Sequence, residues 1–326
     1  MEKLTIASSA RLHMTLIDLN GSLGRVDGGI GLALKEPEIV LEFCKSGDLE
    51  ISGVEGELFN RLSNAAYQLM DRLNIEGSVS INANNEIPEH SGLGSGTQSL
   101  LCTGYGISKL YDIDMSIREL ACILGRGGTS GIGTAAFEKG GFIVDAGHRF
   151  GMGYKEKFAP TSASKGIPPA PVIANYNFPD WNVILAIPEV KKGSHGEEEA
   201  QLFEKLCPVP LREVREISHI ILMNILPAII EEDIKTFGGG VERMQRIGWK
   251  KIEIEYQHPV IAKTMETMKD SGAFGVGMSS WGPAVFGFSD SERESRQIQK
   301  ETRRFLDDSV RGVTLITKAR NKGVEL

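Results

Sequence analysis

The sequence has few cysteines, no long apolar run and no dense cluster of basic residues. Its four cysteines are far apart and form no CxxC pair, so neither a zinc site nor a disulfide framework is expected. They are Cys44, Cys102, Cys122 and Cys207. The most apolar segment, residues 219–230, is too short to cross a bilayer and is interrupted by Asn224 and Pro227. The first residues show no targeting pattern, so we expect a cytoplasmic protein without membrane contact.

The charge balance argues against a nucleic-acid partner. The net charge is −7, and no block of like charges is long enough to act as an interaction tail. A phosphorylated ligand would therefore depend on local positive groups or on helix N-termini, because the overall field does not attract it. The composition, with 41% hydrophobic and 24% charged residues, is typical of a globular protein.

A length of 326 residues favours two domains. We place them at residues 1–178 and 179–326, because residues 166–179 contain four prolines and form the best candidate for a connector. Strands alternate with helices after it, which indicates an α+β fold ending in a split β-α-β sandwich. The expected strands are residues 3–6, 12–18, 30–34, 40–43, 49–52, 78–82, 140–145, 182–187, 273–278, 283–288 and 313–317. The expected helices are residues 57–73, 97–110, 116–124, 209–230, 259–270 and 291–306.

The most informative segment runs from Pro88 to Thr97, between an expected strand and an expected helix, and reads PEHSGLGSGT. Its glycines let several N–H groups point into one concavity, and the following helix adds unpaired N–H groups. We predict that pyrophosphate binds there, with Ser95 also able to reach Mg²⁺. The pyrophosphate residues are Ser91, Gly92, Gly94, Ser95, Gly96 and Thr97. The alternative is a tight turn whose small residues serve packing.

The pattern Pro-x-x-Ser-Gly-Leu-Gly-Ser-Gly resembles the second motif of the GHMP superfamily, which includes galactokinases, homoserine kinases and mevalonate kinases. The glycine-rich segment 277–287 is similar to the third motif of that superfamily. The resemblance spans nearly the whole chain. It implies an N-terminal domain like ribosomal protein S5 domain 2, a C-terminal ferredoxin-like domain, and a loop that wraps polyphosphate as the ATP-binding loop of the kinases does.

One position departs from the kinases. Members with a catalytic aspartate place it in a Ser-Gly-x-Asp stretch, where this sequence has Ser130-Gly131-Ile132-Gly133. Glycine cannot remove a proton from a substrate hydroxyl, so base catalysis from this position is lost. Since not all relatives use the base, an ATP-dependent small-molecule kinase stays open as an alternative.

Four separated segments, residues 10–13, 17–21, 24–31 and 125–134, carry a narrower resemblance. They are similar to segments of an archaeal family, the β-ribofuranosylaminobenzene 5′-phosphate synthases. That resemblance implies a pentosyltransferase of tetrahydromethanopterin synthesis, which condenses phosphoribosyl pyrophosphate with 4-aminobenzoate or 4-hydroxybenzoate and releases CO₂ and pyrophosphate. Attack by an aromatic carbon needs no hydroxyl deprotonation, because the ring regains aromaticity by losing CO₂. Such an enzyme can keep the polyphosphate loop without the base.

These segments supply the candidate site residues. The catalytic candidates are Asp27, Arg25 and His13. Arg25 would pair with a phosphate or carboxylate, and Asp27 would stabilise positive charge at the ribose C1 or, with Ser95, hold Mg²⁺. The alternatives are a surface Arg–Asp pair and a hydrogen-bonded core histidine. The substrate-binding candidates are Arg126, Thr129, Ser130, Lys191 and His195, with His90 and Trp281 as further contacts.

Three functions therefore stay open. The first is the pentosyltransferase, dependent on Mg²⁺ and without an organic cofactor. The second is the kinase, and the third is a non-catalytic sensor of a phosphorylated ligand. The expected partners are small-molecule substrates, and analogy with dimeric relatives implies a homodimer.

Overall fold

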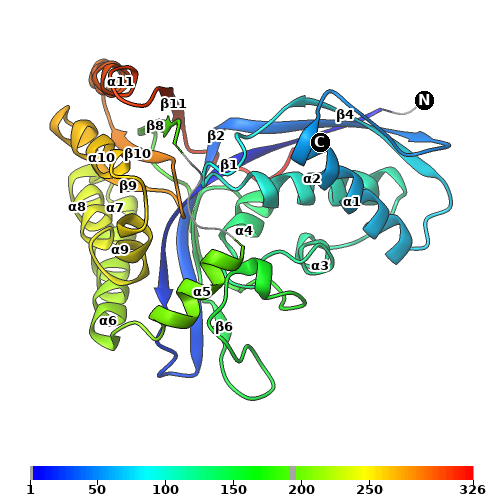
Figure 1. The fold of residues 1–326 in the computed structure, drawn as a ribbon, viewed down its shortest axis with the longest axis horizontal. Helices are drawn as coiled ribbons and strands as arrows, with labels where there is room; N and C mark the ends of the chain where they lie inside the picture. The colour runs from blue at the N-terminus through cyan, green and yellow to red at the C-terminus, as the bar shows by residue number, and fades with distance from the viewer. Residues whose placement is uncertain (1–2, 191–195, 326) are drawn as a thin grey trace.

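The structure is a computed structural model that describes residues 3–190 and 196–325. Its longest element is an antiparallel hairpin of β1 (Leu4–Asp18) and β2 (Arg25–Ser46), which reaches across the molecule (Figure 1). The sequence predicted two short strands in place of each, and that division was wrong. The pairing shifts register between Ser9 and Arg11, so a bulge, and not a turn, absorbs the irregular residues.

The N-terminal sheet has seven strands in the order β3-β4-β2-β5-β7, with β1 and β6 also pairing with β2. The further strands are β3 (Glu50–Ser52), β4 (Ser78–Asn85), β5 (Phe142–Asp145), β6 (His148–Arg149) and β7 (Val172–Tyr176). The predicted connector, residues 166–179, contains β7, which pairs with β5. This is possible because the prolines of the connector lie before and after β7 and leave its N–H groups intact.

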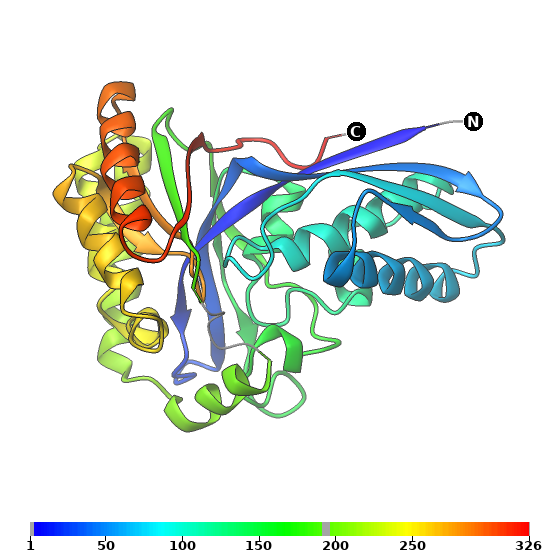
Figure 2. The ribbon, with the colours of Figure 1, turned by 45° about the horizontal axis from the view of Figure 1, so that its top comes forward.

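Four helices accompany this sheet on one side (Figures 1 and 2). They are α1 (Gly56–Arg72), α2 (Ser95–Leu110), α3 (Ile117–Ile123) and α4 (Ile132–Glu138). A capping box opens α3: Ser116 accepts a hydrogen bond from the Glu119 N–H, and the Glu119 carboxylate accepts one from the Ser116 N–H. The helical pattern predicted for residues 57–73 is confirmed by α1, whose apolar side chains are buried.

The C-terminal sheet has four strands in the antiparallel order β11-β8-β10-β9. They are β8 (Asn182–Pro188), β9 (Phe274–Met278), β10 (Val285–Ser289) and β11 (Gly312–Lys318). The helices are α5 (Glu197–Leu206), α6 (Leu211–Ile220), α7 (Leu226–Ile230), α8 (Ile234–Met244), α9 (Gly248–Glu255), α10 (Val260–Asp270) and α11 (Glu292–Asp307). The prediction that residues 209–230 are helical is confirmed over residues 211–230, with a π-helical segment, Ile221–Ile225, between α6 and α7 just before Pro227.

One apolar core extends across both sheets. The ring of Phe178 lies 6.3 Å from Phe142 of β5, 5.3 Å from Phe237 of α8 and 5.6 Å from Phe288 of β10, measured between ring centroids. The two halves of the chain are therefore packed against each other. This packing brings the loop before α2 against the turn between β9 and β10.

Candidate functional site

The phosphate loop, residues 88–97, connects β4 to α2. The helix begins at Ser95, and its N-cap Gly94 has a φ of 88°, in the left-handed region. Gly92 has a φ of 82°, and a Cβ at that position would lie 2.2 Å from the carbonyl oxygen of Ser279. Any larger residue at Gly92 would collide with the backbone of the C-terminal half, so the glycine is required by both conformation and space.

The start of α2 provides the donors that the sequence predicted. The Thr97 N–H bonds back to the Gly94 carbonyl oxygen at 3.0 Å, which leaves the N–H groups of Ser95 and Gly96 without an intrahelical acceptor. Together with the helix dipole, these groups favour a bound anion. The Ser95 hydroxyl donates to the Glu89 carboxylate at 3.1 Å.

Residues from both halves of the chain hold the loop in shape. The Gly92 carbonyl oxygen accepts hydrogen bonds from the Arg11 guanidinium of β1 and from the Ser279 hydroxyl, the latter at 2.8 Å. The Ser91 carbonyl oxygen accepts one from the Ala284 N–H at 2.9 Å. The Ser91 hydroxyl is itself turned back onto the carbonyl three residues earlier, at 2.6 Å. The predicted third motif therefore forms the β9–β10 turn and braces the loop directly.

Arg126 comes from the glycine-rich loop between α3 and α4 and joins the phosphate loop. Its guanidinium donates to the Thr97 hydroxyl oxygen from Nη2 at 2.7 Å and from Nε at 3.1 Å. Burial, and then the neighbouring Arg61, lower the pKa of Arg126 to about 10, so it keeps its charge at neutral pH. Gly133 faces the same threonine, and a Cβ on it would lie 3.0 Å from Thr97 Cγ2. The position that carries aspartate in the kinases thus has little room for one.

Asp27, a predicted catalytic and metal residue, is buried in an ion-pair network. Its side chain is 1% exposed, and its carboxylate lies 2.9 Å from Lys155 Nζ and 2.6 Å from His148 Nδ1. Lys155 also donates to the Gly128 carbonyl oxygen at 3.0 Å and to the Thr129 hydroxyl at 3.2 Å. The Asp27 carboxylate therefore balances the buried charge of Lys155, which in turn holds the glycine-rich loop between α3 and α4 in place. Lys155 and His148 could not be predicted as site residues, because neither belongs to any of the sequence motifs.

The other predicted residues near this network mostly bind backbone. Arg25 donates to the carbonyl oxygens of residues 146–147 at 3.0 and 2.8 Å, so it holds the β5–β6 turn. The Ser130 hydroxyl accepts from the N–H two residues ahead at 3.3 Å, at the start of α4. Lys191 and His195 lie outside the described residues, and their assignment stays a prediction.

His13 is enclosed between the two halves. Its side chain is 4% exposed, and neither ring nitrogen has a hydrogen-bond partner among the described residues. The backbone N–H of His13 donates to the Ser279 hydroxyl at 3.0 Å, and the backbone carbonyl oxygen of His13 accepts from the Ser280 N–H at 2.8 Å. Burial, followed by the charges of Lys250 and Arg11, lowers the pKa of His13 well below its usual value, so the ring is neutral at pH 7.

Two helices of the C-terminal half add charged side chains that no sequence motif indicated. Lys250 and Glu253 of α9 form a buried ion pair, and Lys250 Nζ donates to the Ser280 carbonyl oxygen at 3.0 Å. Glu199 of α5 accepts a hydrogen bond from Trp281 Nε1 at 2.8 Å, and burial raises the pKa of Glu199 to about 7. These three charged residues lie on amphipathic helices, and the sequence pattern of such helices does not indicate which charged residues are buried at a site.

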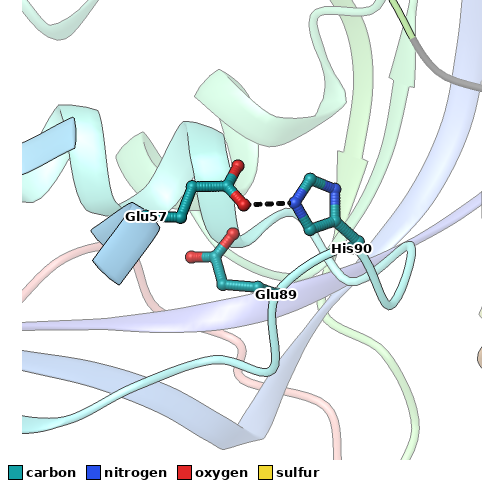
Figure 3. Close-up of side chains that lie close together, drawn as sticks. All are labelled: Glu57, Glu89 and His90. Atoms are coloured by element: carbon teal, nitrogen blue, oxygen red, sulfur yellow. Dashed lines mark hydrogen bonds and ion pairs between the residues drawn. The ribbon is translucent and has the colours of Figure 1, made fainter. Parts of the chain in front are cut away.

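Within the described residues, one group of side chains has the spacing of metal ligands. Ligand atoms of Glu57 from α1 and of Glu89 and His90 from the phosphate loop lie within 4.8 Å of one another (Figure 3). Glu57 and His90 Nε2 are 2.7 Å apart. Arg61 lies between the carboxylates, 2.6 Å from Glu89 and 3.1 Å from Glu57. Carboxylate oxygens suit Mg²⁺, but Arg61 already supplies positive charge there and must move for a cation to bind.

Comparisons with known proteins agree with this arrangement. Residues 60–141 match the family model for the GHMP kinases N terminal domain, and residues 225–308 match the model for the GHMP kinases C terminal region. The chain is 46% identical over 298 residues to the beta-ribofuranosylphenol 5′-phosphate synthase of Methanothermobacter thermautotrophicus, covering 89% of this chain and 90% of the relative. It is 44% identical over 326 residues to the protein of that name in Archaeoglobus fulgidus, covering 99% of both.

Solved structures show the same fold at low identity. The mevalonate kinase of L. major superimposes with a TM-score of 0.71 at 15% identity, covering 98% of this chain and 97% of that one. The homoserine kinase of Cytophaga hutchinsonii gives 0.66 at 15% identity, covering 100% and 97%. The predicted α+β fold with GHMP-type halves is confirmed. Among the described residues, no helix combines the length and apolar character that a membrane crossing requires.

Proposed function

The chain belongs to the family of the β-ribofuranosylphenol 5′-phosphate synthases, and on this basis we propose that it is a decarboxylating pentosyltransferase. The ring carbon of 4-hydroxybenzoate that bears the carboxylate forms a bond to C1 of phosphoribosyl pyrophosphate. The bond from C1 to pyrophosphate breaks, and the ring then loses CO₂. The name of the relatives specifies a phenol, which favours 4-hydroxybenzoate over 4-aminobenzoate as the acceptor.

The observation that supports this proposal is that a glycine-rich loop with unpaired N–H groups opens α2, while glycine and not aspartate stands at position 133. The proposed polyphosphate cradle consists of the α2 N-terminus and the loop braced from both halves. At Gly133, a Cβ would lie 3.0 Å from Thr97 Cγ2, so a carboxylate at this position would require Thr97 to shift. A reaction whose nucleophile is an aromatic carbon, and which expels pyrophosphate, needs the loop and not the aspartate.

The roles follow from where charge develops. As C1 separates from pyrophosphate, negative charge grows on the leaving group, and the N–H groups of Ser95 and Gly96 face that charge without reorganising. Arg126 is held against Thr97 and keeps a full positive charge beside the loop. His13 is buried and neutral, which fits a position beside a developing cation at C1 better than a charged imidazolium would.

Mg²⁺, when bound, would screen the charge of the departing pyrophosphate. The side chains that would hold it, once Arg61 has moved aside, are Ser95, Glu89 and Glu57, which lie where the starts of α1 and α2 meet the phosphate loop. Asp27 was the other predicted ligand, but its oxygens are bonded to Lys155 and His148. The metal is therefore proposed at the Glu57–Glu89 group.

One assay tests the proposal. The full chain is incubated with phosphoribosyl pyrophosphate, Mg²⁺ and 4-hydroxybenzoate labelled in its carboxyl group, and released CO₂ is counted. We expect label release that depends on the donor and stops when 4-hydroxybenzoate is replaced by benzoate, because the ring then lacks its activating hydroxyl. ADP formation from ATP with a small alcohol, without CO₂ release, would instead identify a kinase. Binding of donor without any turnover would indicate a sensor.

A further inference from the structure

A cavity of about 580 Å³ is lined by Arg25, Arg118 and residues between 147 and 171. Its lining includes five side chains able to carry positive charge and no carboxylate among the described residues. They are Arg25, Arg118, His148, Arg149 and Lys155. The whole chain carries a net charge of −7, so this is a local excess and not a consequence of composition. Such a concentration of one sign within a cavity attracts an anion.

The charge of this cavity is only partly balanced. Asp27 lies behind the wall and neutralises Lys155, while also bonding His148. No carboxylate of residues 3–190 or 196–325 forms an ion pair with Arg25, Arg118 or Arg149. The cavity wall thus holds three guanidinium charges without a counter-charge.

The bonds that these arginines make leave their charge in place. Arg25 and Arg118 donate to backbone carbonyl oxygens, Arg25 at residues 146–147 and Arg118 at residues 169–170. Arg149 is exposed and donates to the Tyr154 hydroxyl at 2.9 Å. Neutral acceptors satisfy N–H groups and fix the planes of the guanidiniums, but they do not remove positive charge. The arginines are therefore positioned for an anion before it arrives.

We propose that this cavity binds a phosphate monoester. Three guanidinium charges without a counter-charge, together with the N–H groups that their backbone and Tyr154 contacts leave over, favour a phosphate dianion over a halide or a single hydroxyl. The rest of the wall is largely apolar, with Ile167, Pro168, Pro169 and Pro171, and the volume exceeds that of phosphate alone. The cavity therefore fits a phosphate attached to a compact organic body.

Two sources could supply that group. The first is the 5′-phosphate shared by the donor and the product of the reaction, an assignment that rests on the proposed function. The second is a separate phosphorylated metabolite. The contacts favour the first, because Lys155 in the wall donates to Gly128 and Thr129, and Arg126 of the same loop contacts Thr97. The loop of residues 125–134 thus connects the cavity wall to the phosphate loop.

The test is a calorimetric titration of the full chain with ribose 5-phosphate and, separately, with inorganic phosphate. Arg149→Gln and Arg118→Gln are compared with Arg303→Gln, a control on α11 whose exposed guanidinium pairs with Asp307. We expect each cavity variant to bind ribose 5-phosphate about 10- to 100-fold more weakly, the cost of one charged hydrogen-bonded contact. The control should match the wild type. Arg149 is exposed, so its variant folds even if the Arg118 variant, checked by circular dichroism, does not.

The outcomes separate the possibilities. Equal affinity of the wild type and Arg149→Gln for ribose 5-phosphate would overturn the site. Weaker binding together with a raised KM for phosphoribosyl pyrophosphate, at unchanged kcat, would identify the monoester as that of the substrate. Weaker binding with unchanged donor kinetics would support the site and assign it to a separate ligand. Since the titration involves no turnover, its result stands even if no CO₂ is released in the assay of the proposed reaction.

Discussion

Replacing Asp27 by asparagine distinguishes a structural carboxylate from a catalytic one. The change keeps the size of the side chain but removes the charge that balances Lys155, which is only 4% exposed. Removing one partner of a buried ion pair costs about 3–5 kcal/mol, because the other charge is left uncompensated. The free energy of unfolding of a typical domain is about 5–15 kcal/mol. We therefore expect Asp27→Asn to lose a large fraction of its stability.

The loss should depend on pH with a definite sign. Burial already lowers the pKa of Lys155 in the folded protein, and Asp27 is the main group that raises it again. Without Asp27 the folded pKa falls further, while the unfolded value stays near 10.5. Between these two pKa values the unfolded chain binds more protons, so stability rises with pH. The deficit of Asp27→Asn relative to the wild type should therefore shrink between pH 7 and pH 9.

Urea unfolding followed by fluorescence at both pH values measures this, with CO₂ release recorded on the same samples. The matched control is the double variant Asp27→Asn/Lys155→Met, which removes both charges and should recover part of the lost stability. An Asp27→Asn protein that unfolds at the wild-type urea concentration but has lost its turnover would refute the structural role. That result would instead support the catalytic role that the sequence predicted for Asp27.

Three further predictions concern the loop and its surroundings. Ser95→Ala should lower kcat/KM for phosphoribosyl pyrophosphate about 10- to 100-fold, through loss of one hydrogen bond to a charged group; unchanged steady-state kinetics would count against the cradle. Gly133→Asp should lower the thermal midpoint, with an overpacking cost of about 1–3 kcal/mol against Thr97, and should form no ADP from ATP; a stable variant with kinase activity would contradict the steric argument. Burial raises the pKa of Glu199 to about 7, so the folded state binds more protons than the unfolded state between pH 4.5 and 7. The contribution of Glu199 to the free energy of unfolding therefore falls as the pH rises through that range. Glu199→Gln, which can still accept from Trp281, should flatten that decline in urea-unfolding measurements, and an identical slope would show that Glu199 does not titrate there.

The features that could be predicted from the sequence are those that depend on glycine at particular positions. Gly92 and Gly94 adopt positive φ angles, and a Cβ at Gly92 would collide with the carbonyl oxygen of Ser279. The phosphate loop could therefore be recognised in the sequence, because its backbone requires glycine at these positions. The missing aspartate at Gly133 was equally visible in the sequence. The steric reason for its absence was not, because Thr97 lies 36 positions away in the chain and only the packing of α4 against α2 brings the two together.

The sequence did not predict partnerships between distant charged residues. Lys155 reaches Asp27 across 128 positions, and its own neighbours in the sequence belong to no motif. A buried lysine is recognised only once its surroundings are known, since the same residue type is usually exposed. The β1–β2 hairpin was divided in prediction for a related reason: a bulge and a turn have similar residue preferences, and pairing with the opposite strand decides between them.

The double hydrogen bond at the Gly92 carbonyl has a consequence for protein engineering. Hybrids that join the first half of one family member to the second half of another will work only if the arginine of β1 and the serine of the β9–β10 turn are inherited as a matched pair. Transplanting the phosphate loop alone into a foreign scaffold will leave that oxygen without either donor. Recombination within this family is therefore constrained across the junction between the halves, and not only inside each of them.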